Sequence, residues 1–414
     1  MAPAIINDGN IVMTAKSKGT PKKQTQSSVL HRSLHHEPMR VVRASGNYLE
    51  LSTGQSIFDA TGGAAVACLG HGNKRVNAAV VKQMQDFSYC HSLFFSSNSA
   101  EELAEELTSS THGHMTKLFV VSSGSEAMEA AMKLARQYFL EVAPPQPQRT
   151  RFIGRKESYH GNTLGSLSMS GHVARRSIYE PVLLGNISRV SACNAYRGMK
   201  RGETTEQYVA RLAQELDDEF ARVGPETVIA FVAEPVVGAA LGCVPAVPGY
   251  FVAMKSVCDR YGALLILDEI MCGMGRTGSL HAWEQEGVVP DIQTIGKGLG
   301  GGYAAVAGIL INRRVVNALE QGTGAFSHGQ TYQGHPVACA AALEVQQIIR
   351  EHGLLANVRQ MGSLLETLLK QKLGNHPHVG DIRGRGLFWG VSPAEMRLSH
   401  FDFVDKPLNF MLTL

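Results

Sequence analysis

The sequence has few of the features that mark membrane proteins, disulfide-rich proteins or nucleic-acid-binding proteins. No uninterrupted apolar run reaches the roughly 18 residues of a membrane-spanning helix, so we expect no membrane partner. The seven cysteines are scattered without a C-x-x-C pair, which favours reduced thiols over a disulfide framework or a metal site. The formal charge is only +3, and the basic excess lies before residue 46, so the main body offers no surface for nucleic acid.

The first residues lack the apolar block of a secretory signal. Lysines and serines near the start are features of mitochondrial presequences, but Asp8 and a weak amphipathic pattern are not. We therefore expect a cytoplasmic location rather than a mitochondrial one. Residues 1–37 are polar and are expected to form a flexible leader.

The body of the chain alternates between short apolar runs and amphipathic stretches. Its 414 residues, of which 44% are hydrophobic, are enough for two or three domains. Short strands with turns are predicted over 41–60, and buried strands at 118–121, 228–232, 264–267 and 305–311. Helices are predicted between them and again over 338–373, followed by a strand at 387–391. This alternation predicts an α/β fold with a mostly parallel sheet that is flanked by helices on both faces.

The first informative motif is an apolar strand at 117–121 that leads through the small residues Ser122–Ser125 into a helix. The inner stripe of that helix is predicted to include Ala127, Leu134 and Tyr138. Free N–H groups and the positive dipole end at the start of such a helix bind anions, above all phosphate. An ordinary capped helix start is the alternative.

The second motif is the run 263–270, where a buried strand ends in the carboxylates Asp268 and Glu269. Strand alternation puts Asp268 and Ile270 on one face and Glu269 on the other. A carboxylate beside an apolar side chain suits a protonated ring nitrogen that rests on an apolar floor. The alternative is a pair of acids bonded to neighbouring loops, because buried charges need partners.

The third motif is Lys297, which lies among five glycines in 294–302, directly after a predicted strand at 291–295. Glycines allow backbone and ligand to approach closely, and a desolvated lysine loses its proton readily and becomes a nucleophile. A glycine-rich surface loop with a solvated lysine is the alternative.

Two nucleotide-binding motifs are considered and set aside. The apolar strand and acids of 264–269 resemble an ATPase magnesium site, but the chain contains no G-x-x-x-x-G-K-[ST]. Gly273, Gly275 and Gly278 match the dinucleotide fingerprint formally. Two acids separate the preceding strand from Gly273, and they would repel a pyrophosphate, so we interpret this match as coincidental.

Six motifs then occur in a specific order. They are Ser123–Ala127, Tyr159–Gly161, Glu234–Pro235, Leu267–Ile270 with Gly275–Gly278, Gly296–Lys297, and Thr331–Pro336. In order and spacing they resemble the class III, or omega-type, aminotransferases, which are fold type I enzymes that use pyridoxal 5'-phosphate. The resemblance extends from about Val42 to Gly390.

The resemblance implies two domains. Residues 73–337 would form a large domain that binds pyridoxal phosphate, and residues 38–72 and 338–414 would contribute to a smaller α+β domain. After residue 390 the sequence departs from the family pattern. We therefore expect a truncated C-terminal part, with consequences for closure over the substrate.

The resemblance also implies roles around the cofactor. Lys297 would bind it covalently and shuttle a proton, and Asp268 would keep its ring nitrogen protonated. Gly124 and Ser125 would bind the phosphate. The other implied cofactor-binding residues are Tyr159 on one ring face, Ile270 on the other face, and His160 and Glu234 beside the cofactor. For Glu234, a carboxylate that only fixes a turn is the alternative.

Two further residues are implied to act at the edges of the site. Thr331 would reach the phosphate of the neighbouring subunit, so we expect a homodimer with its active site at the interface; a hydroxyl that caps the following turn is the alternative. Arg383 resembles an arginine that binds a substrate carboxylate, and a salt-bridged structural arginine is the alternative there. Leu93, Phe94 and Phe95 are candidates for the pocket wall or for the core.

The predicted activity is transfer of an amino group from an amine or amino acid to a 2-oxo acid in two ping-pong half-reactions. Gly238–Ala240 replace a glutamate that some relatives use to admit side-chain amines, so that switch is absent. One alternative is another pyridoxal-phosphate reaction of the family, such as that of a decarboxylase, racemase or lyase. Another is a truncated isoform that keeps the fold with little activity.

Overall fold

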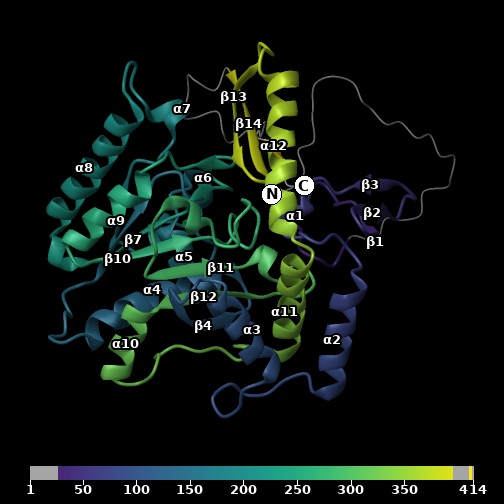
Figure 1. The fold of residues 1–414 in the computed structure, drawn as a ribbon, viewed down its shortest axis with the longest axis horizontal. Helices are drawn as coiled ribbons and strands as arrows, with labels where there is room; N and C mark the ends of the chain where they lie inside the picture. Colours follow the sequence, from purple (N-terminus) through teal and green to yellow (C-terminus); the bar gives the residue numbers. More distant parts are fainter. Residues whose placement is uncertain (1–26, 395–409, 413–414) are drawn as a thin grey trace.

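The computed structural model describes residues 27–394 and the backbone of 410–412, and Figure 1 shows its fold. Residues 27–37 contain no helix or strand, and the rest of the predicted leader lies outside the described residues. Most of the predicted atypical tail, 395–409 and 413–414, also lies outside them. No helix in the described part of the chain combines the length and the apolar character needed to cross a membrane.

A seven-stranded sheet forms the centre of the molecule, with strand order β4-β12-β11-β10-β7-β5-β6. Its strands are β4 (Met115–Val121), β5 (Arg151–Arg155), β6 (Ile187–Val190), β7 (Val228–Ala233), β10 (Leu264–Asp268), β11 (Ile292–Ile295) and β12 (Ala307–Asn312). Neighbouring strands from β11 to β6 pair in parallel, whereas β12 is antiparallel to both β11 and β4. The predicted mostly parallel sheet is confirmed.

The central strands are continuous apolar runs because both faces of the sheet are covered. Every residue of β7 and of β10 is buried. Parallel sheets select such runs rather than an alternation of apolar and polar residues. Because β4 runs in the same direction as β11, the six parallel strands all end at one edge of the sheet.

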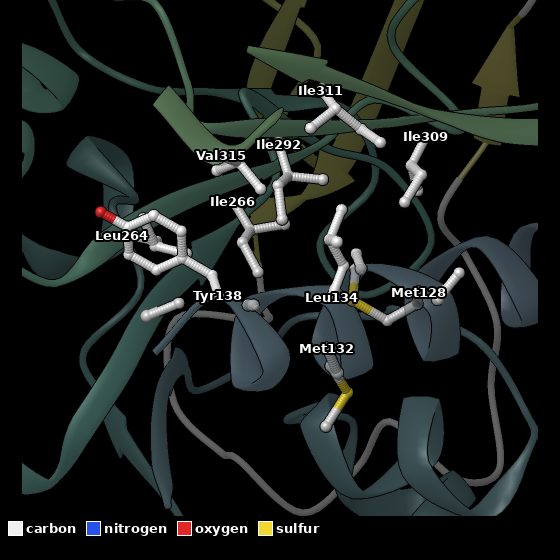
Figure 2. Close-up of a cluster of buried hydrophobic side chains, with 14 of the residues drawn as sticks. Met128, Met132, Leu134, Tyr138, Leu264, Ile266, Ile292, Ile309, Ile311 and Val315 are labelled. Atoms are coloured by element: carbon white, nitrogen blue, oxygen red, sulfur yellow. The ribbon is translucent and has the colours of Figure 1, made fainter. Parts of the chain in front are cut away.

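One face is covered by α4 (Gly124–Glu141) and α10 (Arg313–Gln321). The predicted inner stripe of α4, which includes Ala127, Leu134 and Tyr138, is at most 6% exposed. In Figure 2, side chains of α4 lie beside those of the sheet and of α10; those labelled are Met128, Met132, Leu134, Tyr138, Leu264, Ile266, Ile292, Ile309, Ile311 and Val315. Burial of one leucine contributes about 1.5–3 kcal/mol, so this stripe anchors the helix firmly.

The other face is covered by four helices that belong to two apolar clusters. Helices α8 (Thr205–Val223) and α9 (Tyr250–Arg260) pack on β5, β7 and β10. Helices α3 (Asn98–Ser109) and α11 (Pro336–Glu351) pack on β4, β11 and β12. The helices predicted over 203–222 and from 338 onward are confirmed.

Smaller elements surround this body. An antiparallel sheet contains β1 (Val41–Ser45), β2 (Tyr48–Leu51) and β3 (Ser56–Phe58), and another contains β13 (Val379–Arg385), β14 (Phe388–Pro393) and β15 (Phe410–Leu412). The remaining elements are α1 (Gly62–Ala65), α2 (Lys74–Asp86), α5 (Leu164–Met169), α6 (Val173–Arg176), α7 (Ala195–Gly198), α12 (Leu354–Leu373), β8 (Val236–Val237), β9 (Val244–Pro245), and the 3-10 turns η1 (Glu180–Val182), η2 (Pro225–Thr227), η3 (Ala282–Glu286) and η4 (Lys297–Leu299).

The single strand predicted at 387–391 is one half of a hairpin. It corresponds to β14, whose partner β13 has the sequence VGDIRGR and was not predicted. All seven residues of β13 are half-buried, so they show no alternation of apolar and polar residues. Two glycines and three charged residues further lower the strand propensity of this segment. The division into a large and a small domain stays a prediction.

Candidate active site

The predicted site residues gather at the edge where the parallel strands end. Strand β10 ends at Asp268, β7 is followed by Glu234, and β11 is followed by Gly296 and Lys297. In open α/β sheets this edge is where ligands bind, because the connections leave the sheet there and open a crevice.

Asp268 receives three hydrogen bonds from three segments. Its Oδ2 lies 2.7 Å from Nδ1 of His160, and its Oδ1 accepts hydrogen bonds from Thr294 Oγ1 (3.0 Å) and the Ile270 N–H (3.1 Å). The side chain is only 4% exposed. A carboxylate offers about four acceptor positions, so these bonds fix its orientation and leave capacity for one further donor.

His160 is buried in an orientation that directs its ring toward Asp268. Its ring is fully buried, and its backbone N–H donates to Ser170 Oγ (2.8 Å). The ring Nε2 has no hydrogen-bond partner among the described residues. Because the carboxylate needs a donor, we assign the ring proton to Nδ1. An unpaired buried polar atom costs about 1–3 kcal/mol, which the bond to Asp268 must offset.

Glu234 joins two loops at the end of β7. Its Oε1 accepts the N–H of Tyr159 (3.0 Å), and its Oε2 accepts the N–H of Gly238 (3.2 Å). Complete burial raises the pKa of Glu234, while the nearby His160 opposes that shift. These contacts match the alternative in which Glu234 fixes a turn, and they hold its carboxyl group against the backbone of Tyr159.

The start of α4 offers backbone N–H groups to a ligand. Ser123 is the N-cap, and its Oγ accepts the N–H of Glu126 (3.3 Å). Within the described residues, the N–H groups of Gly124 and Ser125 have no hydrogen-bond partner. Together with the positive end of the helix dipole, these donors suit an anion such as phosphate.

Close packing brings this helix start to the other motifs. A Cβ at Gly124 would lie 2.7 Å from Ile270 Cδ1, and a Cβ at Gly296 would lie 3.4 Å from Ile270 Cγ2. Ile270 therefore lies between the start of α4 and the glycine after β11. Ser125 Oγ accepts the N–H of Asn162 (2.9 Å), which ties α4 to the loop after β5.

Lys297 has an unusual backbone conformation and an altered pKa. Its φ of 46° lies in the left-handed region, which residues other than glycine adopt rarely and often at functional sites. Desolvation lowers the pKa of Lys297, and the charges of Asp268 and Glu234 oppose the shift. A lowered pKa increases the fraction of neutral amine, which is the nucleophilic form.

One face of the Tyr159 ring is already covered by a cation. The guanidinium carbon of Arg175, in α6, lies 4.6 Å from the ring centroid. Such a contact stabilises the ring in one orientation. The predicted stacking of Tyr159 on a cofactor therefore concerns the opposite face.

The structure does not connect Thr331 and Arg383 directly to these residues. Thr331 is exposed, and the bonds of the described residues include none from its hydroxyl to the following turn. In β13, Arg383 Nη1 donates to Ser392 Oγ (2.6 Å) and Asp381 Oδ2 (3.1 Å), and Nη2 donates to the carbonyl of Leu241 (2.7 Å). Its Nε is buried and has no hydrogen-bond partner in the described part of the chain, and the role of Arg383 in binding a carboxylate stays a prediction.

Sequence reasoning missed two residues that support the site. Thr294 reaches Asp268 because the parallel register of β10 and β11 pairs these two residues. That register was the available signal, since both residues lie at the end of their predicted strands. Ser170 bonds the backbone of His160 across the turn that contains α5, and no local pattern indicates this contact.

The carboxylate next to Asp268 has a separate structural role. Glu269 accepts hydrogen bonds from the N–H groups of Ala282 (2.6 Å) and Trp283 (2.7 Å) and from Gln293 Nε2 (2.9 Å). Burial raises the pKa of Glu269 to about 8, against the effect of these donors. The alternative in which the acids bond neighbouring loops is therefore right for Glu269.

Other residues singled out by the sequence lie elsewhere. Leu93, Phe94 and Phe95 are 74%, 73% and 65% exposed, so the prediction that they belong to the core is wrong. A Cβ at Gly278 would lie 2.8 Å from Arg359 Cγ, so the third glycine of the formal dinucleotide match packs against α12. All seven cysteines are free thiols.

Comparisons with known proteins agree with this geometry. Residues 29–407 match the family model described as aminotransferase class-III. A Gibberella zeae protein named aminotransferase is 61% identical over 87% of this chain and 71% of its own length, and an uncharacterized aminotransferase of Schizosaccharomyces pombe is 50% identical over 91% and 82%.

Solved structures give the same result. The omega transaminase of Pseudomonas jessenii in complex with PMP is 36% identical, with a TM-score of 0.82 over 87% of this chain and 80% of that one. An (S)-enantioselective omega-transaminase from Thermomicrobium roseum is 35% identical, with a TM-score of 0.83 over 88% and 80%.

Proposed function

The chain belongs to the class III aminotransferases, enzymes that depend on pyridoxal phosphate, and on that premise we propose which of its residues carry the reaction. As a transaminase it moves an amino group from an amine or amino acid to a 2-oxo acid. One observation supports the proposal above all: a buried carboxylate, a lysine of lowered pKa and a free helix start meet at one strand edge.

These residues fit the chemical groups of pyridoxal phosphate. When bound, this cofactor supplies a reactive carbonyl carbon and an electron-withdrawing ring that stabilises negative charge next to the transferred nitrogen. Asp268 has capacity for one more donor, which suits the ring nitrogen. The unpaired N–H groups of Gly124 and Ser125 suit the phosphate, and Ile270 offers an apolar surface beside them.

Lys297 would hold the cofactor covalently and carry the proton. Burial lowers the pKa of its amine, which increases the fraction of the neutral form that attacks a carbonyl carbon. The same amine would also act as the base that takes a proton from the substrate carbon, and as the acid that gives it to the cofactor carbon. Its left-handed φ turns the chain sharply after Gly296 and so limits the positions that the amine reaches.

His160 and Thr294 would act as positioning residues for Asp268. Their donors lie 2.7 and 3.0 Å from different oxygens of the carboxylate and fix its plane. With its plane fixed in this way, Asp268 would accept a hydrogen bond from the ring nitrogen of the cofactor.

The protein is further proposed to act as a cytoplasmic homodimer. The free thiols favour the cytoplasm, where disulfides are rare. Large apolar side chains gather on the surface near Thr331: Tyr332 is 59% exposed, its ring centroid lies 6.0 Å from that of Tyr89, and the loop after Tyr89 carries the exposed Phe94. Exposed apolar patches of this kind mark interaction sites, and a second copy of the chain is the occupant we propose.

The direct test is cofactor binding and turnover. Purified protein is mixed with pyridoxal phosphate, and the visible absorbance of the bound cofactor is recorded for the native chain and for Lys297→Ala. We expect the native absorbance to be lost in Lys297→Ala and to respond to an amine donor. Repeated amino-group transfer should require a 2-oxo acid, because the first half-reaction alone allows a single turnover. Continued product formation without a 2-oxo acid would instead indicate a lyase or decarboxylase.

A further inference from the structure

A row of polar side-chain contacts, which we call the seam, joins α4 to the segment that carries Thr331. We call residues 322–331, between α10 and α11, the strap; it leaves the end of α10 in the lower part of Figure 1. Most of its residues are exposed, so the core does not hold it. Its apolar anchor is Phe326, whose ring centroid lies 5.2 Å from that of Phe119 in β4.

Beside the C-terminal half of α4, the seam consists of hydrogen bonds between the strap and the side chains of Gln137 and Glu141. Gln137 Oε1 accepts the N–H of Ser327 (2.9 Å), and its Nε2 donates to the carbonyl of Ala325 (2.7 Å). Glu141 accepts both the N–H and the hydroxyl of Thr323, each at 2.7 Å, and these bonds lower the pKa of Glu141. Gln137 also donates to Glu141 (2.9 Å), so the two side chains brace each other.

Beside the N-terminal half of α4, the seam reaches residues Ser122–Ser125, which we call the phosphate turn because the proposed function places the phosphate there. Lys133 Nζ lies 2.9 Å from Nδ1 of His328. In the amide orientation that satisfies both of its ends, Gln330 donates to Glu126 Oε1 (3.1 Å) and accepts the N–H of Ser122 (3.2 Å). Glu126 Oε2 accepts the same Ser122 N–H (2.9 Å).

The seam runs antiparallel to the helix. Its α4 members are spaced by seven, four and four residues, which places them on one helix face beside the buried stripe. The strap pairs with them in reverse order, from Thr323 at the end of α4 to Gln330 at its start. Helix α4 thus presents its first N–H groups to a phosphate and holds, on its outer face, the segment that ends in Thr331.

From this arrangement we infer that Gln137 and Glu141 are positioning residues for the cofactor site of the other subunit. This inference rests on the proposed function, in which Thr331 reaches the partner's phosphate. The hydrogen bonds of the seam hold the strap in place, and the strap in turn positions Thr331. Gln330, which directly precedes Thr331, bonds to the phosphate turn of its own subunit. A defect in the seam of one subunit therefore weakens cofactor retention in its neighbour more than in itself.

The test uses hybrid dimers in which only one subunit reports. A blind subunit carries Lys297→Ala, and a reporting subunit keeps Lys297; differently tagged chains are co-expressed and the hybrid is isolated. Gln137→Met removes the polar contacts at similar side-chain length. Gln214→Met is the matched control, because Gln214 in α8 also bonds an acid four residues later, Asp218 (2.8 Å), but holds no loop.

With Gln137→Met in the blind subunit, pyridoxal phosphate should leave the reporting subunit about tenfold faster, which corresponds to the loss of one or two net hydrogen bonds. With Gln137→Met in the reporting subunit, release should match the control. The reverse pattern, equal loss in both hybrids, or native release in both would overturn the inference. Native protein without lysine-dependent absorbance, or a protein that stays monomeric, would instead overturn the proposed function.

A second measurement needs no cofactor. In homodimers without pyridoxal phosphate, hydrogen exchange at the Ser327 amide should be about tenfold faster in Gln137→Met than in the native chain or in Gln214→Met, because its acceptor is removed. The Thr323 amide, which Glu141 still holds, should change less. Unchanged exchange at Ser327 would show that the seam does not hold the strap.

Discussion

The contact between Gly124 and Ile270 gives a quantitative prediction. A methyl group at Gly124 would lie 2.7 Å from Ile270 Cδ1 and 2.9 Å from Cγ2, compared with about 3.5–4.0 Å for relaxed carbon contacts. The φ of Gly124 is not in the left-handed region, so Gly124→Ala strains no backbone angle there, and the cost is steric. Either Ile270 or the start of α4 must move.

Overpacking of this size costs about 1–3 kcal/mol, or about five- to 150-fold in an equilibrium constant. Because the displaced groups are the phosphate donors and the apolar surface beside them, we expect Gly124→Ala to weaken pyridoxal phosphate binding within that range. Ile270→Val removes Cδ1 and should by itself cost about 0.5–1.5 kcal/mol. In the double variant the shortest contact is gone. The loss of binding free energy in the double variant should therefore be about 1 kcal/mol smaller than the sum of the losses in the two single variants.

The assay is equilibrium titration of the cofactor-free protein with pyridoxal phosphate for the four members of this cycle. Gly185→Ala is the matched control, because no atom lies within 4 Å of a Cβ built at Gly185 and its φ is not left-handed. The control should bind like the native chain. Additive losses, within about 0.5 kcal/mol, would refute the view that Gly124 is needed because Ile270 lies against it.

Three further predictions concern Asp268 at the end of β10, the next residue Glu269, and Lys297. Asp268→Asn should lower kcat about 100-fold or more while the cofactor stays bound, because a preorganised charge is lost; native kcat would contradict its role. Glu269→Ala leaves the N–H groups of Ala282 and Trp283 without their acceptor, whereas Gln293 Nε2 keeps its contact with His281 Nδ1. The change should destabilise the cofactor-free protein by about 2 kcal/mol or more in thermal unfolding, and an unchanged melting temperature would count against it. The rate of cofactor incorporation should rise with pH as Lys297 loses its proton. Because burial lowers the pKa of Lys297, the midpoint of this rise should lie below the pKa of roughly 10.4 of free lysine. A midpoint at or above that pKa would contradict the prediction.

Local patterns in the sequence predicted the main fold and the three motifs at the strand ends, whereas the roles of the site residues came from the resemblance to a family. A buried strand that ends in Asp268 and a small turn before α4 are visible in consecutive residues, and the structure has both. Contacts between distant segments were not visible. That Thr294 and His160 share Asp268 depends on strand order and register, and β13 shows no apolar alternation because each of its residues is half-buried.

The two sides of α4 illustrate the same limit. The inner stripe of small and apolar residues can be recognised in the sequence, because such side chains at helical spacing are typical of a buried face. The outer positions Glu126, Lys133, Gln137 and Glu141 have the same helical spacing but are polar, and polar residues on a helix surface ordinarily face water. Only the strap lying against them gives that face a role. A polar helix face next to an exposed loop is therefore better judged by its hydrogen bonds than by its composition, and here those bonds connect the phosphate turn to Thr331.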